Sequence, residues 1–243
     1  TSIEKIYSTI SHEPDVKAPN NPVVRSKIDG NIIFDHVSYN ADDEDILHDI
    51  SFEVKAGETV GIIGATGSGK STLMNLLCRF YDTTSGDVYV DEVNVKDVDL
   101  YSLRENIGMA MQDVFLFSDT IEGNISYGRP DCSFEEVEWA AKVANADEFI
   151  RKMSDGYDTI VGERGMGLSG GQKQRISLAR ALLMDPAIVI LDDTTSAVDM
   201  ETETRIQEEL NSLSSKKTVF IIAHRISSIK DADKIIVLDE GRI

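Results

Sequence analysis

The feature that most constrains this chain is a glycine-rich run that joins a short apolar segment to a helix-forming one. Residues 64–72 read Gly-Ala-Thr-Gly-Ser-Gly-Lys-Ser-Thr, with the apolar segment 59–63 before them and the helix-type segment 71–80 after them. A strand that leads through a tight loop into a helix is the repeating unit of α/β proteins. The run therefore predicts an α/β fold with this loop at the carboxyl end of a buried strand.

The same run matches the spacing G-x-x-x-x-G-K-[S/T] of loops that cradle phosphate groups. Glycines let successive backbone N–H groups curl around phosphate oxygens, and the helix N-terminus adds partial positive charge. Lys70 can reach the β- and γ-phosphates, and the Ser71 hydroxyl can ligate Mg²⁺. A glycine-rich turn without a ligand is the alternative, which the complete match in this context disfavours. We therefore predict that ATP is bound by Gly64, Ala65, Thr66, Gly67, Ser68, Gly69, Lys70, Ser71 and Thr72.

A second apolar strand supplies the carboxylate that such a site needs. Residues 188–191 are Ile-Val-Ile-Leu, and Asp192 and Asp193 follow them directly. Open α/β sheets bind ligands at the carboxyl ends of their strands, so Asp192 is expected to help hold Mg²⁺ there. An ordinary strand end is an equally good interpretation of this segment alone, and the glycine-rich loop decides in favour of the metal.

Composition excludes several other classes of protein. The chain has 43 acidic and 24 basic residues, for a net charge of −19. A chain this acidic, with its basic residues scattered, is not expected to bind nucleic acid. Its longest apolar runs, such as residues 187–191, fall far short of the roughly 18 residues of a membrane span. The two cysteines, Cys78 and Cys132, form no metal-binding or disulfide pattern, so a reducing compartment fits best, with Cys78 as a small buried apolar side chain.

The order of segments predicts how the chain is organised. Residues 1–27 are expected to be the end of an amphipathic helix followed by a proline-rich linker, and residues 28–243 to form one domain. Residues 115–184 are rich in helix formers and are expected to be a helical insertion in an α/β domain with a mainly parallel sheet. Further strands are expected at residues 31–34, 50–54, 88–90, 218–223 and 234–238, and a helix at residues 201–213. The last residues, 241–243, look like the start of another strand, so we expect sequence to be missing at both ends.

Between the two phosphate-site motifs lies a second small-residue loop. Leu168, Ser169, Gly170, Gly171 and Gln172 read LSGGQ and precede a helix-forming run. Such a loop can bind an anion through exposed N–H groups, whereas a simply capped helix start would not explain the two glycines.

With this loop, the sequence resembles the nucleotide-binding domain of ATP-binding cassette (ABC) transporters, whose signature is LSGGQ. The resemblance runs from about residue 28 to the last residue and covers several ordered motifs. It implies a P-loop NTPase (RecA-like) core with a mainly parallel sheet, an antiparallel β subdomain, and a helical subdomain that carries the signature. It also implies that the signature contacts ATP held by a second ABC domain, as a homodimer or heterodimer.

Further roles follow from the resemblance alone. It implies that the ring of Tyr39 stacks on the adenine of ATP, although a tyrosine in a strand otherwise packs in the core or on the surface. It gives Gln112 contact with Mg²⁺ and with the γ-phosphate, and it makes His224 the switch residue at the γ-phosphate. The expected catalytic set is therefore Asp193, His224, Lys70 and Gln112, and the expected Mg²⁺ set is Ser71, Gln112 and Asp192. Ser196, Ala197, Val198 and Asp199 resemble the loop that crosses the dimer interface, with valine where leucine is usual.

One position departs from the family pattern. The residue after the metal-site aspartate is normally a glutamate that orients the attacking water, and here it is Asp193. Its carboxylate is set back by roughly 1 Å, and a displacement of that size can slow a reaction on the order of a hundredfold. The same change occurs in one subunit of heterodimeric exporters, so the chain could carry the weaker of two ATP sites.

Other segments narrow the subfamily. Residues 162–165, 113–117 and 120–125 are similar to exporter-type cassettes, in which these regions face the coupling helices of a membrane domain. We therefore predict a soluble piece of an exporter at the cytoplasmic face of a membrane. A soluble ABC ATPase and a nucleotide-dependent dimerisation module with little turnover are the alternatives. A P-loop kinase is disfavoured because it would not need LSGGQ.

Overall fold

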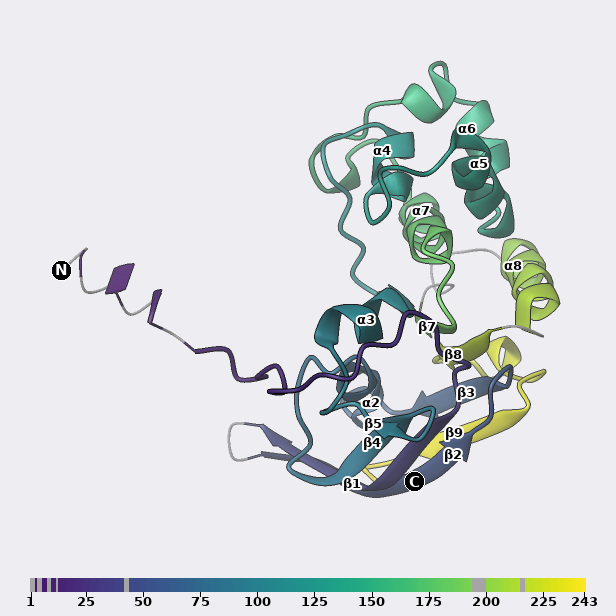
Figure 1. Cartoon of the computed structure of the whole chain (residues 1–243). Helices are drawn as coiled ribbons and strands as arrows, with labels where there is room; N and C mark the ends of the chain where they lie inside the picture. The colour runs from purple at the N-terminus through teal and green to yellow at the C-terminus, as the bar shows by residue number, and fades with distance from the viewer. Residues whose placement is uncertain are drawn as a thin grey trace.

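The computed structural model describes residues 3, 6–7, 10–11, 13–41, 44–193, 200–214 and 217–243. Two sheets form one part of the molecule and a group of helices forms another, with the N-terminal segment extending away from both (Figure 1). The arrangement is the α/β fold that the sequence predicts.

A parallel sheet forms the centre of the fold. Its strands are β6 (Ile107–Ala110), β7 (Ile188–Asp192), β8 (Thr218–Ile222), β3 (Thr59–Gly64) and β9 (Lys234–Leu238), in that order across the sheet. Each neighbouring pair is parallel. Every residue of β7 is buried, which accounts for its continuous apolar sequence. The carboxyl ends of β3 and β7 therefore lie at the same edge of the sheet.

A second sheet is antiparallel, as the family resemblance implies. It consists of β2 (Glu44–Val54), β1 (Ile32–Ala41), β4 (Ser85–Val90) and β5 (Val93–Asn94) in that order. Phe34 and Phe52 stack across β1 and β2 with ring centroids 4.6 Å apart. One buried core joins this sheet to α2 (Lys70–Leu77) and to the parallel sheet.

The helices of the middle segment enclose a second core. They are α4 (Ile121–Ser126), α5 (Phe134–Val143), α6 (Asp147–Arg151) and α7 (Gly170–Leu183). Their buried side chains join those of β7 and of α8 (Met200–Ser214) in a single cluster. These four helices all fall within residues 115–184, the segment for which the sequence predicts a helical insertion.

Some boundaries differ from those expected. The first helix ends at Leu77 rather than at residue 80, because Arg79 is left-handed (φ 50°) and its N–H turns back to Leu76 O. The hairpin strands β1 and β2 are longer than residues 31–34 and 50–54. At the C-terminus, Arg242 forms only an isolated bridge with Asp239 rather than the start of a strand.

The sequence did not predict the short strands β5 and β6 or the helix α3 (Leu100–Glu105). β6 has only four residues, and its Gly108 lowers its apparent strand propensity. The glycine is required, because a Cβ there would lie 2.7 Å from the Pro186 ring and 2.8 Å from Ala181 O. Packing therefore selects a residue that sequence propensity disfavours.

Within the described residues, no helix is both long and apolar enough to cross a membrane. The amphipathic helix expected at residues 1–10 is described only at residues 3, 6, 7 and 10, which are helical. Cys78 is 3% exposed, and burial raises the pKa of its thiol to about 12, so it is the apolar core residue that the sequence predicts.

Candidate functional site

The glycine-rich loop, residues 64–72, connects β3 to α2 and is called the phosphate loop below. Gly69 is the N-cap of α2 and has φ 97°, a left-handed conformation that glycine adopts without strain. A Cβ on Gly64 would lie 2.1 Å from Leu238 O, so only glycine fits between β3 and β9. The loop therefore needs its glycines for both the turn and the close approach of the next strand.

Lys70 is folded back over this loop. Its side chain is buried, and Nζ donates to Gly64 O at 2.9 Å and to Ala65 O at 2.8 Å. Burial lowers the pKa of Lys70, and the charges of Asp192 and Asp193 oppose that shift. The two carbonyl oxygens thus hold the ammonium group at the phosphate loop. A phosphate oxygen bound there could replace them as the acceptor of its hydrogen bonds.

Ser71 and Asp192 form the contact that joins the two sequence motifs. The Ser71 hydroxyl donates to Asp192 Oδ2 at 2.8 Å, across 121 positions of sequence. Burial raises the pKa of Asp192, the negative charge of Asp193 adds to the rise, and Ser71 and Lys70 counteract it. A hydroxyl and a partly buried carboxylate at one strand edge are oxygen ligands of the type that Mg²⁺ takes.

These residues line one cleft with a volume of about 330 Å³. The cleft is lined by Glu44, Ile46, Thr66, Gly67, Gly69, Lys70, Ser71, Thr72, Gln112, Asp192 and His224. The structure therefore brings together residues of the phosphate loop, Asp192, Gln112 and the exposed His224, all of which the sequence singles out as candidates.

Asp193 lies just beyond Asp192, in a left-handed conformation with φ 48° that Asp tolerates better than most residues. Its N–H donates to Ile222 O at 3.0 Å, and its own carbonyl accepts from Gln174 Nε2 at 3.3 Å. Gln112 Nε2 is 3.4 Å from Asp193 Oδ2. The carboxylate is therefore beside the cleft and next to Gln112, which is where a water-orienting group would act.

Four predicted ATP-binding residues do not line the cleft: Tyr39, Gly64, Ala65 and Ser68. Tyr39 is half-buried against the first core, and its ring lies 5.5 Å from that of Tyr81. Ala65 and Ser68 belong to the phosphate loop but lie outside the cleft lining. Ser68 is 4% exposed, and its Oγ has no hydrogen-bond partner among the described residues.

The LSGGQ segment, residues 168–172, is called the signature loop below. Ser169 is the N-cap of α7: its Oγ accepts from Gln172 N at 3.3 Å, and Gln172 Oε1 accepts from Ser169 N at 2.9 Å. This reciprocal capping box confirms the capped helix start that the sequence suggested as the local interpretation. Ser169 and Gly170 are nevertheless exposed, while Leu168 packs against the second core. The loop is fixed from inside and open on its outer side.

The proposed interface loop, Ser196, Ala197, Val198 and Asp199, lies outside the described residues. Sequence reasoning missed Glu44 and Ile46, which line the cleft from β2. Nothing in their local sequence marks them, since they reach the cleft only through the pairing of β2 with β1. Gln174 was also missed, although its place two residues after the signature loop was a usable signal.

Comparison with known proteins defines the class. The ABC transporter family model matches residues 47–196, from β2 to the segment that follows β7. The chain therefore belongs to the ABC transporter family, and it is an ABC ATP-binding domain.

Individual relatives agree with this assignment. The chain is 48% identical over 244 residues to "Putative multidrug export ATP-binding/permease protein YgaD" of Bacillus subtilis (strain 168), covering 100% of this chain and 42% of that protein. It is 49% identical over 242 residues to the ABC transporter ATP-binding protein YknU of the same organism, covering 99% of this chain and 41% of that protein.

A solved structure described as a bacterial Atm1-family ABC exporter with ATP bound superimposes with a TM-score of 0.94 at 43% identity. The match covers 99% of this chain and 43% of that one. The chain thus spans about two fifths of the length of these proteins, and its mixed α/β fold is that of the exporter's matching region.

Proposed function

We propose that this chain binds Mg²⁺-ATP in the cleft and hydrolyses it to drive export of a substrate by a longer membrane protein. The observation that supports the proposal most is the Ser71–Asp192 hydrogen bond beside Lys70, because a hydroxyl and a carboxylate next to the phosphate loop are suited to hold Mg²⁺ there. One carboxylate and one hydroxyl fit Mg²⁺, which usually takes few protein ligands and completes its shell with phosphates and waters. Among the described residues no cluster of three His, Cys, Asp or Glu could hold a metal by itself.

The proposal assigns roles to the polar residues of the cleft and to Asp193 beside it. The phosphate loop and Lys70 bind the phosphates, and Ser71, Asp192 and Gln112 hold the metal. Asp193 orients the attacking water, and His224 contacts the γ-phosphate. Hydrolysis is then catalysed mainly by positioning and by charge stabilisation.

Titration calorimetry with ATP, with and without Mg²⁺, tests this assignment. We expect Mg²⁺ to tighten ATP binding to the chain and to have much less effect on Asp192→Asn. An equal effect of Mg²⁺ on both proteins would contradict the assignment of Asp192 to the metal.

A second ABC domain is proposed to complete the site. Ser169 and Gly170 are exposed, and the capping side chains are bonded within the loop, so its outer side is open to another molecule. We propose that a partner's signature loop closes over ATP bound here, and that this chain's signature loop closes over ATP bound to the partner. ATPase measurements over a range of protein concentrations test this, and a specific activity independent of concentration and of any added partner domain would contradict it.

The membrane half is proposed to dock beside α3. A surface pocket of about 480 Å³ there is lined by Leu100, Tyr101, Arg104, Glu105, Gly128 and Met184. Tyr101 is 76% exposed, which is unusual for so large an aromatic side chain and typical of a binding surface. In this arrangement residues 28–243 form the ATPase domain at the cytoplasmic face of the membrane, and residues 1–27 join it to the preceding membrane helices.

Asp193 favours a second candidate, a module that dimerises on ATP but turns it over slowly. Its side chain is one methylene shorter than the glutamate that the family resemblance leads us to expect, and its Oδ2 lies 3.4 Å from Gln112 Nε2. We propose that turnover at this site is slow, as expected for the weaker site of a heterodimeric exporter. Asp193→Glu in the assembled transporter is expected to raise phosphate release by about tenfold or more, up to on the order of a hundredfold. An unchanged rate would contradict the proposal.

A further inference from the structure

The N-terminal segment is attached to the domain by backbone hydrogen bonds well before β1 begins. Val23 forms a parallel bridge with Val98, and the Arg25 carbonyl accepts from Asn106 Nδ2 at 3.2 Å. Figure 1 shows the segment passing beside α3 on its way to β1. Residues 17–25, called the strap below, therefore lie along the surface next to α3.

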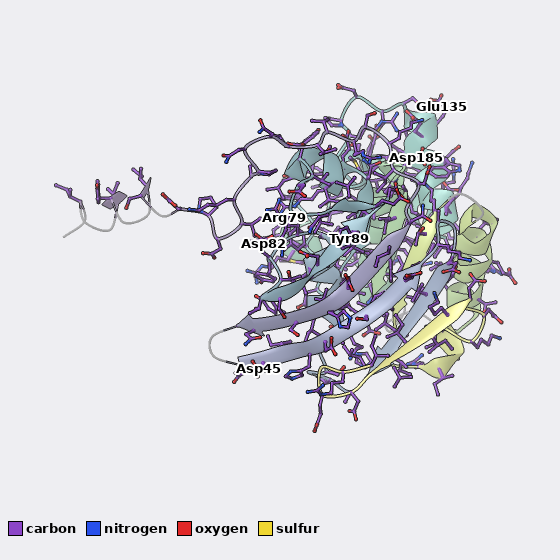
Figure 2. All side chains as sticks on the ribbon, turned by 60° about the horizontal axis from the view of Figure 1, so that its bottom comes forward. Asp45, Arg79, Asp82, Tyr89, Glu135 and Asp185 are labelled. Atoms are coloured by element: carbon purple, nitrogen blue, oxygen red, sulfur yellow. The ribbon has the colours of Figure 1, made fainter. Side chains whose placement is uncertain are left out.

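The first anchor of the strap is the guanidinium of Arg79. Its side chain is 4% exposed, and Nη2 donates to Lys17 O at 2.9 Å. On its other side Nε donates to Asp82 Oδ1 at 2.8 Å, and the two residues lie next to each other in Figure 2. A buried cation needs such partners, so the Lys17 carbonyl is part of what holds this guanidinium in place.

The backbone of Arg79 adds a second, independent observation. Arg79 ends α2: its N–H donates to Leu76 O at 3.0 Å, and Phe80 N donates to Asn75 O at 2.9 Å. These two bonds make the Schellman motif, whose left-handed residue is usually glycine. Here arginine occupies it with φ 50°. The position is strained for arginine, and it directs a side chain with buried hydrogen bonds that glycine could not make.

The helix that Arg79 ends is the one that begins at the phosphate loop. α2 has eight residues, Lys70–Leu77, and is therefore only about 12 Å long. A second arginine secures the same end, because Arg104 donates to Arg79 O at 2.7 Å and to Cys78 O at 3.2 Å. The C-terminal end of α2 is thus bound to the strap and to α3, while its N-terminal end carries Lys70 and Ser71.

From this arrangement we propose that Arg79 is a positioning residue that couples the strap to the nucleotide site through α2. When the strap is seated, the Lys17 carbonyl fixes Arg79, and the short helix holds Lys70 and Ser71 in place for phosphate and Mg²⁺. When the strap is displaced, the helix loosens and ATP binds more weakly. The inference rests on the proposed function, because it assumes that ATP is the ligand of the phosphate loop.

Two matched deletions test the coupling in the 243-residue chain. Removing residues 1–18 deletes the Lys17 carbonyl, whereas removing residues 1–15 retains it. We expect the first deletion to raise the Kd for ATP about fivefold, within the range known for coupling residues, and the second to leave it unchanged. Lys17→Ala keeps the carbonyl and should bind ATP as the unaltered chain does.

Arg79→Gly supplies the complementary test. Glycine suits the left-handed position, so this variant keeps the end of α2 and removes only the guanidinium contacts. It should raise the Kd for ATP as the 1–18 deletion does. The two changes combined should raise the Kd no further than either change alone, because both remove the contact between Arg79 and the Lys17 carbonyl. Hydrogen exchange of the α2 amides should rise in both variants.

The outcomes separate this inference from the proposed function. If the unaltered chain binds no ATP, the proposed function is wrong and the coupling falls with it. If both deletion variants bind ATP as tightly as the unaltered chain does, the coupling is wrong and the proposed function stands. A lower melting temperature of Arg79→Gly with unchanged ATP affinity would also overturn the coupling, because it would show a merely structural role.

Discussion

The phosphate loop and the signature loop have the same local design and a different relation to the rest of the molecule. Each is rich in small residues and leads into a helix, α2 or α7. In the phosphate loop, polar groups from distant parts of the chain converge: Lys70 lies over the loop, and Ser71 reaches Asp192. In the signature loop the polar side chains bond only to their own helix start, through Ser169 and Gln172.

The difference supports the proposal that the phosphate loop acts within the chain and the signature loop on another molecule. An anion bound at the phosphate loop meets a lysine, a hydroxyl and a carboxylate supplied by the same fold. At the signature loop, the side chains of Ser169 and Gln172 are bonded to each other's backbone and no charged group of the described residues lines an anion site, which fits the proposal that a second domain brings the anion. Both loops look alike in sequence, and only their surroundings separate them.

The largest expected effect comes from the tight packing of the phosphate loop. Gly64→Ala would put a Cβ 2.1 Å from Leu238 O and 2.6 Å from Ser68 Oγ. Overpacking of this kind costs about 3 kcal/mol. For a domain of this size that loss corresponds to a fall in Tm of roughly 6–12 °C, measurable by calorimetry.

Gly156→Ala is the matched control for that change. Gly156 has a positive φ of 52°, but a Cβ there would meet nothing within 4 Å. Only the backbone strain of about 1 kcal/mol remains, so the fall in Tm should be much smaller. Equal losses for the two variants would mean that the close approach of β9 does not constrain the loop.

The next effect concerns the signature loop. Ser169→Ala removes the capping bond to Gln172 N and should cost about 1 kcal/mol, or a fall in Tm of roughly 2–4 °C. Because the phosphate loop is complete within the chain, its affinity for ATP should not change. Thermal unfolding and an ATP titration of the same sample check both statements, and a weakened ATP affinity would undo the distinction between the loops.

A smaller effect, of opposite sign, is expected at Asp192. Burial raises the pKa of Asp192 above its ordinary value of 3.8, so the folded state holds this proton more tightly than the unfolded state does. The free energy of unfolding therefore falls as pH rises from 3.8 through the raised pKa, and the ionised group is destabilising at pH 7. In metal-free buffer at pH 7, Asp192→Asn should raise Tm slightly and lose that advantage near pH 3. A lower Tm at pH 7 would show that the carboxylate is stabilising instead.

The smallest effect lies in the hairpin of β1 and β2, outside both loops. The hydrogen bond from His36 Nδ1 to Asp49 Oδ1, at 2.6 Å, and the charges of Asp49 and Asp35 raise the pKa of His36. Its contribution to stability is therefore present below about pH 6.5 and lost as pH rises through the raised pKa. An NMR titration should place the midpoint of His36 above 6.5, and Asp49→Asn should lower it without changing ATP affinity. An unchanged midpoint in the variant would remove Asp49 as the cause.

Much of the nucleotide site could be predicted from the sequence, because its parts carry their own signals. The spacing from Gly64 to Ser71 and the apolar strand before Asp192 each require a strand end, and parallel strands bring those ends together. The adjacency of Ser71 and Asp192 follows from that topology.

The rest depended on tertiary packing. Glu44 reaches the cleft through the register of a hairpin, which its local sequence does not encode. The early end of α2 at Leu77 is not apparent from helix propensity, because it depends on the left-handed backbone of Arg79, whose guanidinium bonds to Lys17 O and Asp82. The short strand β6 is recognisable only when its neighbour β7 is in place.

The most direct test of the division between the loops is an ATP titration of two variants in dilute solution, where the chain is kept monomeric. Lys70→Ala removes the cation of the phosphate loop, and Ser169→Arg places a bulky cation on the open side of the signature loop. We predict that Lys70→Ala weakens ATP binding by about a hundredfold, as loss of charge-assisted hydrogen bonds to phosphate would, while Ser169→Arg binds ATP with unchanged Kd. A comparable loss of affinity in both variants would contradict the account, because it would show that both loops bind ATP within one chain.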